Sequence, residues 1–100
     1  MTDAKKERYR RIRGAILKLL AHEHPHAIDS KVLHFLLDDI GYTMPEEEME
    51  SHLAYLEEKK CLRVEKRKST GLELRMIVIS ANGLDILDNF KQDCGVDVRF

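Results

Sequence analysis

The most constraining feature of this sequence is a change in the spacing of its apolar residues near position 60. Before that point apolar residues recur at intervals of three and four, which is typical of helices that bury one face. From Leu62 apolar and charged residues alternate, and a polar stretch at 66–71 separates this run from an apolar run at 72–79. Two strand-like runs on either side of a polar segment that contains glycine predict a β-hairpin. The spacing therefore favours an α+β fold, mainly α, in which a hairpin follows a helical body.

Three helices are predicted before the hairpin. The first runs from about residue 5 to 22, and its apolar face is Tyr9, Ile12, Ile16, Leu19 and Leu20. The second begins at a cap from Asp29 or Ser30 and ends at Gly41, a residue suited to a left-handed helix end. Its apolar face is Leu33, Leu36, Leu37 and Ile40.

The third helix is predicted to begin with a capping box from Thr43 to Glu46. Its core positions are Met49, Leu53 and Leu56, and only Gly41 and Tyr42 would separate it from the second helix.

A fourth helix is expected after the hairpin, with Ser80 as its cap. Its apolar residues are Leu84, Ile86, Leu87 and Phe90, over roughly three turns that end at Cys94 and Gly95. Val96, Val98 and Phe100 alternate with polar residues and suggest one more strand.

Length and composition predict one domain. The chain has 100 residues, 43% of them hydrophobic, which suits a single domain over 1–100 with a core at about 8–90 and a tail at 91–100. Its longest strongly apolar run, 76–79, is too short to cross a bilayer. We identify no signal peptide, and Cys61 and Cys94 are expected to be reduced thiols. These features predict a cytoplasmic protein.

The charges are grouped, although the net charge is only −1. Residues 1–13 carry six cations and two anions, residues 38–58 carry eight anions and no Lys or Arg, and residues 59–75 carry seven cations and two anions. The chain can therefore present surfaces of opposite sign.

Two short stretches resemble parts of a winged helix-turn-helix domain. Residues 52–62, His-Leu-Ala-Tyr-Leu-Glu-Glu-Lys-Lys-Cys-Leu, are similar to the end of the third helix in repressors of the MarR, PadR and ArsR type. Lys60 stands where that pattern has glycine, so this residue must accept a positive φ or the helix must end differently. Residues 79–87 resemble the passage from the second wing strand into the last helix, with Ser80 and Gly83 at the matching positions.

This resemblance implies a transcriptional regulator that binds duplex DNA, with the third helix in the major groove and the wing on the backbone or minor groove. Cations of the hairpin and of the N-terminal segment would contact phosphates. The expected DNA-binding residues are Arg8, Arg10, Arg11, Arg13, Ser51, Tyr55, Arg63, Lys66, Arg67, Lys68 and Arg75. Many relatives pair through the first and last helices, so a homodimer is also expected, and no cofactor is.

The third helix departs from this pattern. It has no Arg, Lys, Asn or Gln between Pro45 and Glu58, and these four residue types make most contacts to base edges. Its outward positions are predicted to be Glu47, Ser51, Ala54 and Glu58. Acidic residues in a first helical turn interact favourably with the helix dipole, which is one interpretation. The alternative is a protein-protein interaction module that docks a basic partner on this acidic helix.

Catalytic and metal sites receive little support. His22, His24 and His26 could form a zinc site with Cys61 or Cys94, but no Cys-x-x-Cys spacing occurs. No phosphate-binding loop or nucleophile elbow is found. Residues 22–26 have the spacing of the metalloprotease motif His-Glu-x-x-His, but Pro25 predicts a loop there and not the helix that this motif requires. The sequence therefore predicts neither an enzyme nor a metal centre.

Overall fold

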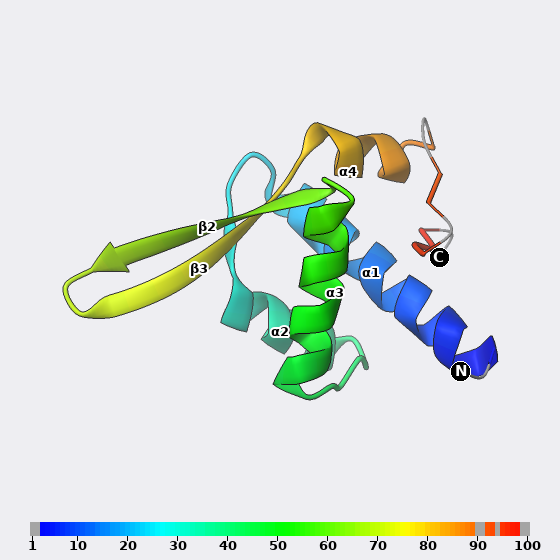
Figure 1. The fold of residues 1–100 in the computed structure, drawn as a ribbon, viewed down its shortest axis with the longest axis horizontal. Helices are drawn as coiled ribbons and strands as arrows, with labels where there is room; N and C mark the ends of the chain where they lie inside the picture. Colours follow the sequence, from blue (N-terminus) through cyan, green and yellow to red (C-terminus); the bar gives the residue numbers. More distant parts are fainter. Residues whose placement is uncertain (1–2, 90–91, 94, 99–100) are drawn as a thin grey trace.

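The computed structural model describes residues 3–89, 92–93 and 95–98, and these form the predicted succession of helices and hairpin. Figure 1 shows a helical body from which the hairpin projects at one end of the molecule. The elements are α1 (Asp3–Glu23), β1 (Ile28–Asp29), α2 (Ser30–Asp39), α3 (Glu46–Glu58), β2 (Leu62–Ser69), β3 (Leu72–Ile79) and α4 (Ala81–Leu87). The predicted α+β, mainly helical class is confirmed. Among the described residues, no helix has the length and hydropathy that a membrane span needs.

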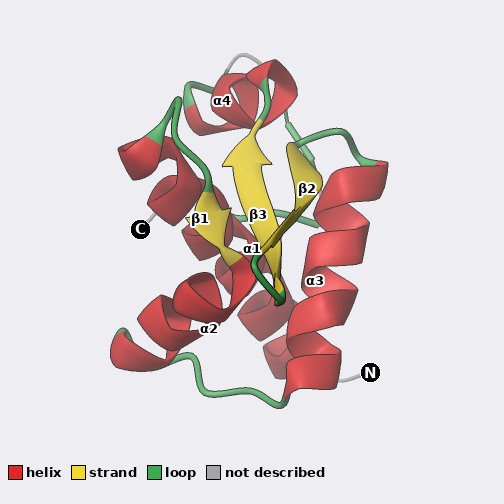
Figure 2. Cartoon of the chain, turned by 90° about the vertical axis from the view of Figure 1, so that its left-hand side faces the viewer, coloured by secondary structure: helices red, strands yellow, loops and turns green. Residues whose placement is uncertain are grey.

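The three strands form one antiparallel sheet in the order β1-β3-β2, which Figure 2 shows between the helices. The short β1 was not predicted from the sequence. It pairs Ile28 with Ile77 of β3, and a strand of only two residues has too little alternation to be recognised. Its pairing depends on a partner far along the chain.

The wing turn is tighter than predicted. Residues 66–69 continue β2, and Ser69 pairs with Leu72, so only Thr70 and Gly71 form the loop. Their φ angles are +49° and +80°. Two consecutive positive φ values are typical of a type I′ turn, which matches the twist of the flanking strands. Lys66, Arg67 and Lys68 therefore belong to the paired strand β2 and not to the loop. Their side chains point alternately to the two faces of the hairpin.

The core lies between the helices and the sheet, and the predicted apolar faces supply most of it. The fully buried side chains include Ile12, Ile16, Leu20, Leu33, Leu37, Met49, Leu53, Leu56 and Ile77. Tyr9, Leu19 and Leu36 are half-buried, and the assignment of Ile40 to the core is wrong because its side chain is 55% exposed. Ile40 follows the last residue of α2, beyond the turns that face the core.

The connection between α2 and α3 contains both a confirmed and a wrong prediction. Gly41 has φ +101°, as expected for a left-handed helix end. The capping box is wrong: the Thr43 hydroxyl donates to Asp38 Oδ1 at 2.5 Å, and Pro45 is the N-cap of α3 without a side-chain cap. The connection therefore spans 40–45 and not only Gly41 and Tyr42.

The exit from α3 follows one of the two predicted routes, because Lys60 takes φ +61°. At the start of α4, Ser80 Oγ accepts a hydrogen bond from the Gly83 N–H at 3.4 Å, which confirms the predicted cap. A Cβ on Gly83 would lie 2.3 Å from the Cys61 carbonyl oxygen. Glycine is needed there because α4 approaches the start of β2 this closely.

The C-terminal part differs from the prediction. Helix α4 ends at Leu87, about two turns after its start, and Asn89 has φ +63°. Val96 and Val98 do not form a strand. Val96 is instead buried in the core, while the neighbouring Asp97 N–H donates to the Arg10 carbonyl at 3.0 Å. The predicted roles of Phe90, Cys94 and Phe100 lie outside the described residues.

Candidate nucleic-acid interface

The outer half of the wing extends beyond the helical body and is exposed (Figure 1). Residues directly opposite in an antiparallel pair share one face of the sheet. Lys66 opposite Arg75 and Lys68 opposite Glu73 therefore lie on the face that carries Val64 and Ile77 nearer the core. Arg63, Glu65 and Arg67 lie on the other face.

The two lysines of the first face are exposed, and neither side chain makes an ion pair or hydrogen bond within the part of the chain that the structure describes. Two residues along a strand span roughly 7 Å. Lys66 and Lys68 thus present two charges in a row along the wing.

On the second face, one carboxylate serves two arginines. Glu65 lies 3.1 Å from Arg67 Nη2 and 4.0 Å from Arg63 Nη2, and the two guanidinium side chains remain 59% and 69% exposed. Both can rotate to another anion, but Glu65 offsets part of their charge.

Arg75 links the base of the wing to α3. Its Nη1 donates to Glu50 Oε1 at 2.5 Å. This hydrogen bond raises the pKa of Arg75, with further contributions from the charges of Glu50, Glu57 and Glu46, although burial opposes them. The predicted phosphate contact of Arg75 therefore competes with an internal partner.

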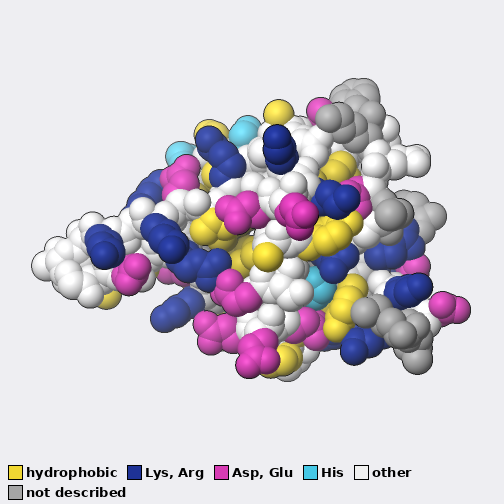
Figure 3. Space-filling view, in the orientation of Figure 1, with side chains coloured by type: hydrophobic (Ala, Val, Ile, Leu, Met, Phe, Trp, Pro, Cys, Tyr) yellow, Lys and Arg dark blue, Asp and Glu magenta, His cyan; other side chains and the backbone are white. Residues whose placement is uncertain are grey.

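The outward face of α3 is confirmed as predicted, since Glu47, Ser51, Ala54 and Glu58 are all exposed. Figure 3 shows acidic side chains gathered over this helix, next to the cations of the wing. Any polyanion that approaches α3 meets this carboxylate surface.

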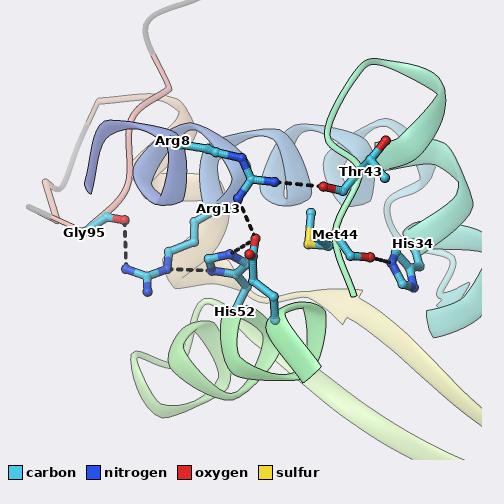
Figure 4. Close-up of polar contacts among 8 residues, drawn as sticks. Arg8, Arg13, His34, Thr43, Met44, His52 and Gly95 are labelled. Atoms are coloured by element: carbon cyan, nitrogen blue, oxygen red, sulfur yellow. Dashed lines mark hydrogen bonds and ion pairs between the residues drawn. The ribbon is translucent and has the colours of Figure 1, made fainter. Parts of the chain in front are cut away.

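Several of the N-terminal arginines have partners inside the chain (Figure 4). Arg8 donates to Glu48 Oε2 at 2.8 Å and to the Thr43 carbonyl at 2.9 Å. Arg13 Nε donates to His52 Nδ1 at 3.2 Å, and its Nη1 donates to the Gly95 carbonyl at 3.3 Å. These bonds join α1 to α3 and to the C-terminal segment.

His52 lies at the centre of this network and is only 1% exposed. Its Nδ1 accepts from Arg13, so its Nε2 carries the proton that faces Glu48 Oε2 at 3.3 Å. Burial, together with the charge of Arg13, lowers the pKa of His52. Because this pKa is lowered, the imidazole of His52 is neutral near pH 7.

The pKa of Glu48 is also lowered. Burial acts to raise it, but the hydrogen bonds from Arg8 and His52 outweigh the effect of burial.

Tyr55 is engaged in the same region. Its hydroxyl donates to Asp93 Oδ1 at 2.6 Å, and the Arg13 guanidinium lies 3.8 Å from the centre of its ring. Burial acts to raise the pKa of Asp93, but the hydrogen bonds from Tyr55 and from the Gly95 N–H outweigh it and leave that pKa lowered. Tyr55 thus anchors the C-terminal segment to α3.

The remaining predicted residues of α1 differ in exposure. Arg10 is half-buried and pairs with Glu7 on the same helix, whereas Arg11 is exposed and also interacts within the chain. The structure thus brings the wing cations together and distributes those of α1 among internal contacts.

The described residues contain no group of three His, Cys, Asp or Glu side chains arranged to hold a metal ion. His22, His24 and His26 are exposed, and Cys61 is buried in the core.

Sequence reasoning missed the network around His52. The signal available was the spacing of Glu48 and His52, four residues apart and hence on one helix face. Nothing in the sequence indicated that Arg8 and Arg13 would meet them.

Two solved structures are similar to this chain. A proposed transcriptional regulator of Thermoplasma acidophilum superposes with a TM-score of 0.65 at 21% identity, over 81% of this chain and 75% of that protein. PadR of Bacillus subtilis, solved in complex with operator DNA, superposes with a TM-score of 0.63 at 15% identity, over 81% of this chain and 48% of PadR. No protein-family model and no curated protein matches the sequence. These similarities show a winged helix-turn-helix fold.

Proposed function

We propose that this winged helix-turn-helix chain is a DNA-binding transcriptional regulator that contacts duplex phosphates mainly through its wing. The observation that carries the proposal is the pair Lys66 and Lys68, exposed on one face of a projecting hairpin and without a carboxylate partner among the described residues. The similarity to PadR, whose structure contains operator DNA, supports the same type of ligand.

The charge of the wing is suited to a polyanion. The hairpin at 62–79 carries five cations and two anions, which gives a net +3. Lysine contacts to phosphates release condensed counterions, so binding through this surface weakens as salt rises. Arg63 and Arg67 contribute further phosphate contacts if a phosphate replaces Glu65 as their ion-pair partner. Arg75 contributes one more if its ion pair with Glu50 dissociates.

Sequence selectivity is expected to be small. The exposed face of α3 offers Ser51 as its neutral hydrogen-bonding side chain, and Tyr55 is held by Asp93. Phosphate contacts position a protein on DNA but carry no sequence information. Duplexes of different sequence should therefore bind with similar affinity.

The N-terminal cations are a secondary part of the proposal. Arg11 is exposed, and Arg10 is half-buried with a partner, Glu7, on its own helix. Arg8 and Arg13 are instead hydrogen-bonded to other elements. Dissociating Arg8 or Arg13 would leave polar partners without a donor, which adds a cost to any phosphate contact they make.

A homodimer also remains a proposal, to be measured by gel filtration with light scattering. The large exposed hydrophobic side chains among the described residues are Val32, Phe35, Ile40 and Leu72, and none of them belongs to α1 or α4.

The test is a titration of random-sequence duplex against the full chain at several salt concentrations between about 50 and 200 mM. Each phosphate contact contributes about 0.9 to the slope of log affinity against log salt, so Lys66→Gln with Lys68→Gln should lower the slope by about 1.8. The matched control is Lys5→Gln with Lys6→Gln, which removes the same charge from the other end of the molecule (Figure 1).

The charge reversal Lys66→Glu, Arg67→Glu and Lys68→Glu should abolish binding at low salt. The wing mechanism is wrong if this triple variant binds duplex as tightly as the wild type. It is also wrong if the control pair changes the slope more than the wing pair does.

A further inference from the structure

A groove of about 370 Å³ lies between α2 and α3, apart from the exposed lysines of the wing. Met49, which is 2% exposed, lines it from α3, and Phe35 lines it from α2. In Figure 2 the wing points toward the viewer, and α2 and α3 lie on this side of the molecule. The groove is large enough to accept one or two side chains of another molecule.

Phe35 is the most exposed large hydrophobic residue of the described chain, at 66%. Val32, one helical turn earlier on α2, is 50% exposed. An aromatic side chain beside a groove is typical of residues that anchor a bound segment, because its burial removes a large apolar area from water. The apolar part of this surface has no covering group among the described residues.

The edge of the groove is acidic. Asp38, Glu46 and Glu50 line it, and Lys31 is the cation among its lining residues. The exposed Glu47 follows on α3, and no Lys or Arg occurs from residue 38 to 58. Opposite potentials on two surfaces favour and orient their association, so this edge selects a cationic molecule.

The chain itself already binds one cation on this surface. The guanidinium of Arg75 contacts Glu50 at 2.5 Å, and the charges of Glu57 and Glu46 contribute to raising its pKa. The carboxylates of α3 therefore act together on a cation at this position. The same field repels phosphates, so it argues against insertion of this groove into DNA.

We propose that the groove between α2 and α3 binds a cationic peptide segment of another protein, with an apolar side chain against Phe35 and Met49 and Lys or Arg side chains against Glu46 and Glu47. The segment is amphipathic, because it must contact both the apolar surface of the groove and its acidic edge. This binding is separate from the contact of the wing lysines with duplex.

The probe is a displayed library of random 12-residue peptides, selected on the full wild-type chain. Recovered peptides should combine Lys or Arg with Leu, Phe or Trp. Their affinity, measured by fluorescence anisotropy, should fall at least tenfold in Phe35→Ser and in the double variant Glu46→Lys with Glu47→Lys. Amide chemical-shift changes should centre on α2 and α3.

Matched controls are available because the relevant side chains are exposed. Leu72→Ser removes a hydrophobic residue of nearly equal exposure, 64%, from the wing, and Glu23→Lys with Asp88→Lys reverses two exposed acids outside the groove. Both controls should leave peptide affinity within twofold of the wild type.

The proposal is overturned if no peptide is enriched, if recovered peptides are acidic, or if Phe35→Ser binds them as the wild type does. It is also overturned if light scattering shows self-association that Phe35→Ser abolishes, because the occupant is then a second copy of this chain. None of these results depends on whether the wing binds DNA.

Discussion

The substitution His52→Leu tests the interpretation that a neutral, buried imidazole holds α1 against α3. Leucine keeps an apolar side chain at a site that is 1% exposed, but it removes the hydrogen bonds to Arg13 and Glu48. Each buried polar group that is left without its hydrogen-bond partner lowers the free energy of unfolding by about 1 to 3 kcal/mol. The lower end applies here because the distances are 3.2 and 3.3 Å and because Glu48 keeps its bond from Arg8. We therefore expect a loss of about 2 kcal/mol in the free energy of unfolding at neutral pH.

The pH dependence of that loss separates the proposed network from simple packing. The pKa of His52 is lowered in the folded chain, so the unfolded chain binds its proton more readily. The stability that neutral His52 contributes is present above the unfolded pKa of about 6.5 and is lost as pH falls through the folded pKa. Protonation would place an N–H donor on Nδ1 opposite the N–H of Arg13.

The assay is urea unfolding of the wild type and His52→Leu, followed by circular dichroism at several pH values from 7.5 to 5. The difference between the two proteins should narrow toward pH 5, since the variant has no proton to bind at this position. Glu48 and Asp93, whose pKa values are also lowered, act mainly below about pH 4.5 and stay outside this range. The control is His22→Leu, which makes the same substitution at an exposed histidine outside this network. A difference that is constant or widens on acidification would refute the neutral, satisfied imidazole.

Two further substitutions test the wing and the exit from α3. Glu50→Gln removes the half-exposed partner of Arg75, so unfolding free energy should fall by less than about 1 kcal/mol while duplex affinity at low salt rises; a fall in affinity would mean that Glu50 positions Arg75 for DNA. Lys60→Gly should raise the free energy of unfolding by about 1 kcal/mol in urea titrations, because φ +61° is strained for lysine, and a loss of stability would contradict that interpretation.

Much of the fold was encoded locally. The helix faces, the positive φ of Gly41, the Ser80 cap and the hairpin followed from spacing and turn residues, because each depends on neighbours within a few positions. The capping box failed because the Thr43 hydroxyl had a better local partner in Asp38, five residues away. The strand β1 could not be predicted, since its two residues form a strand only by pairing with Ile77 and Met76.

For the candidate interface, too, some features follow from the sequence and others from the tertiary structure. The sequence alone determined that a cationic hairpin and an acidic third helix exist, since both are blocks of charge along the chain. Only the tertiary structure decided which cations remain exposed, because Arg8, Arg13 and Arg75 find their partners on elements at least 25 residues away. The strength of those charge pairs depends on the distances that tertiary packing sets, and not on local propensity. Lys66 and Lys68 have no such partner on another element of the described chain, so they remain the exposed cations of one wing face.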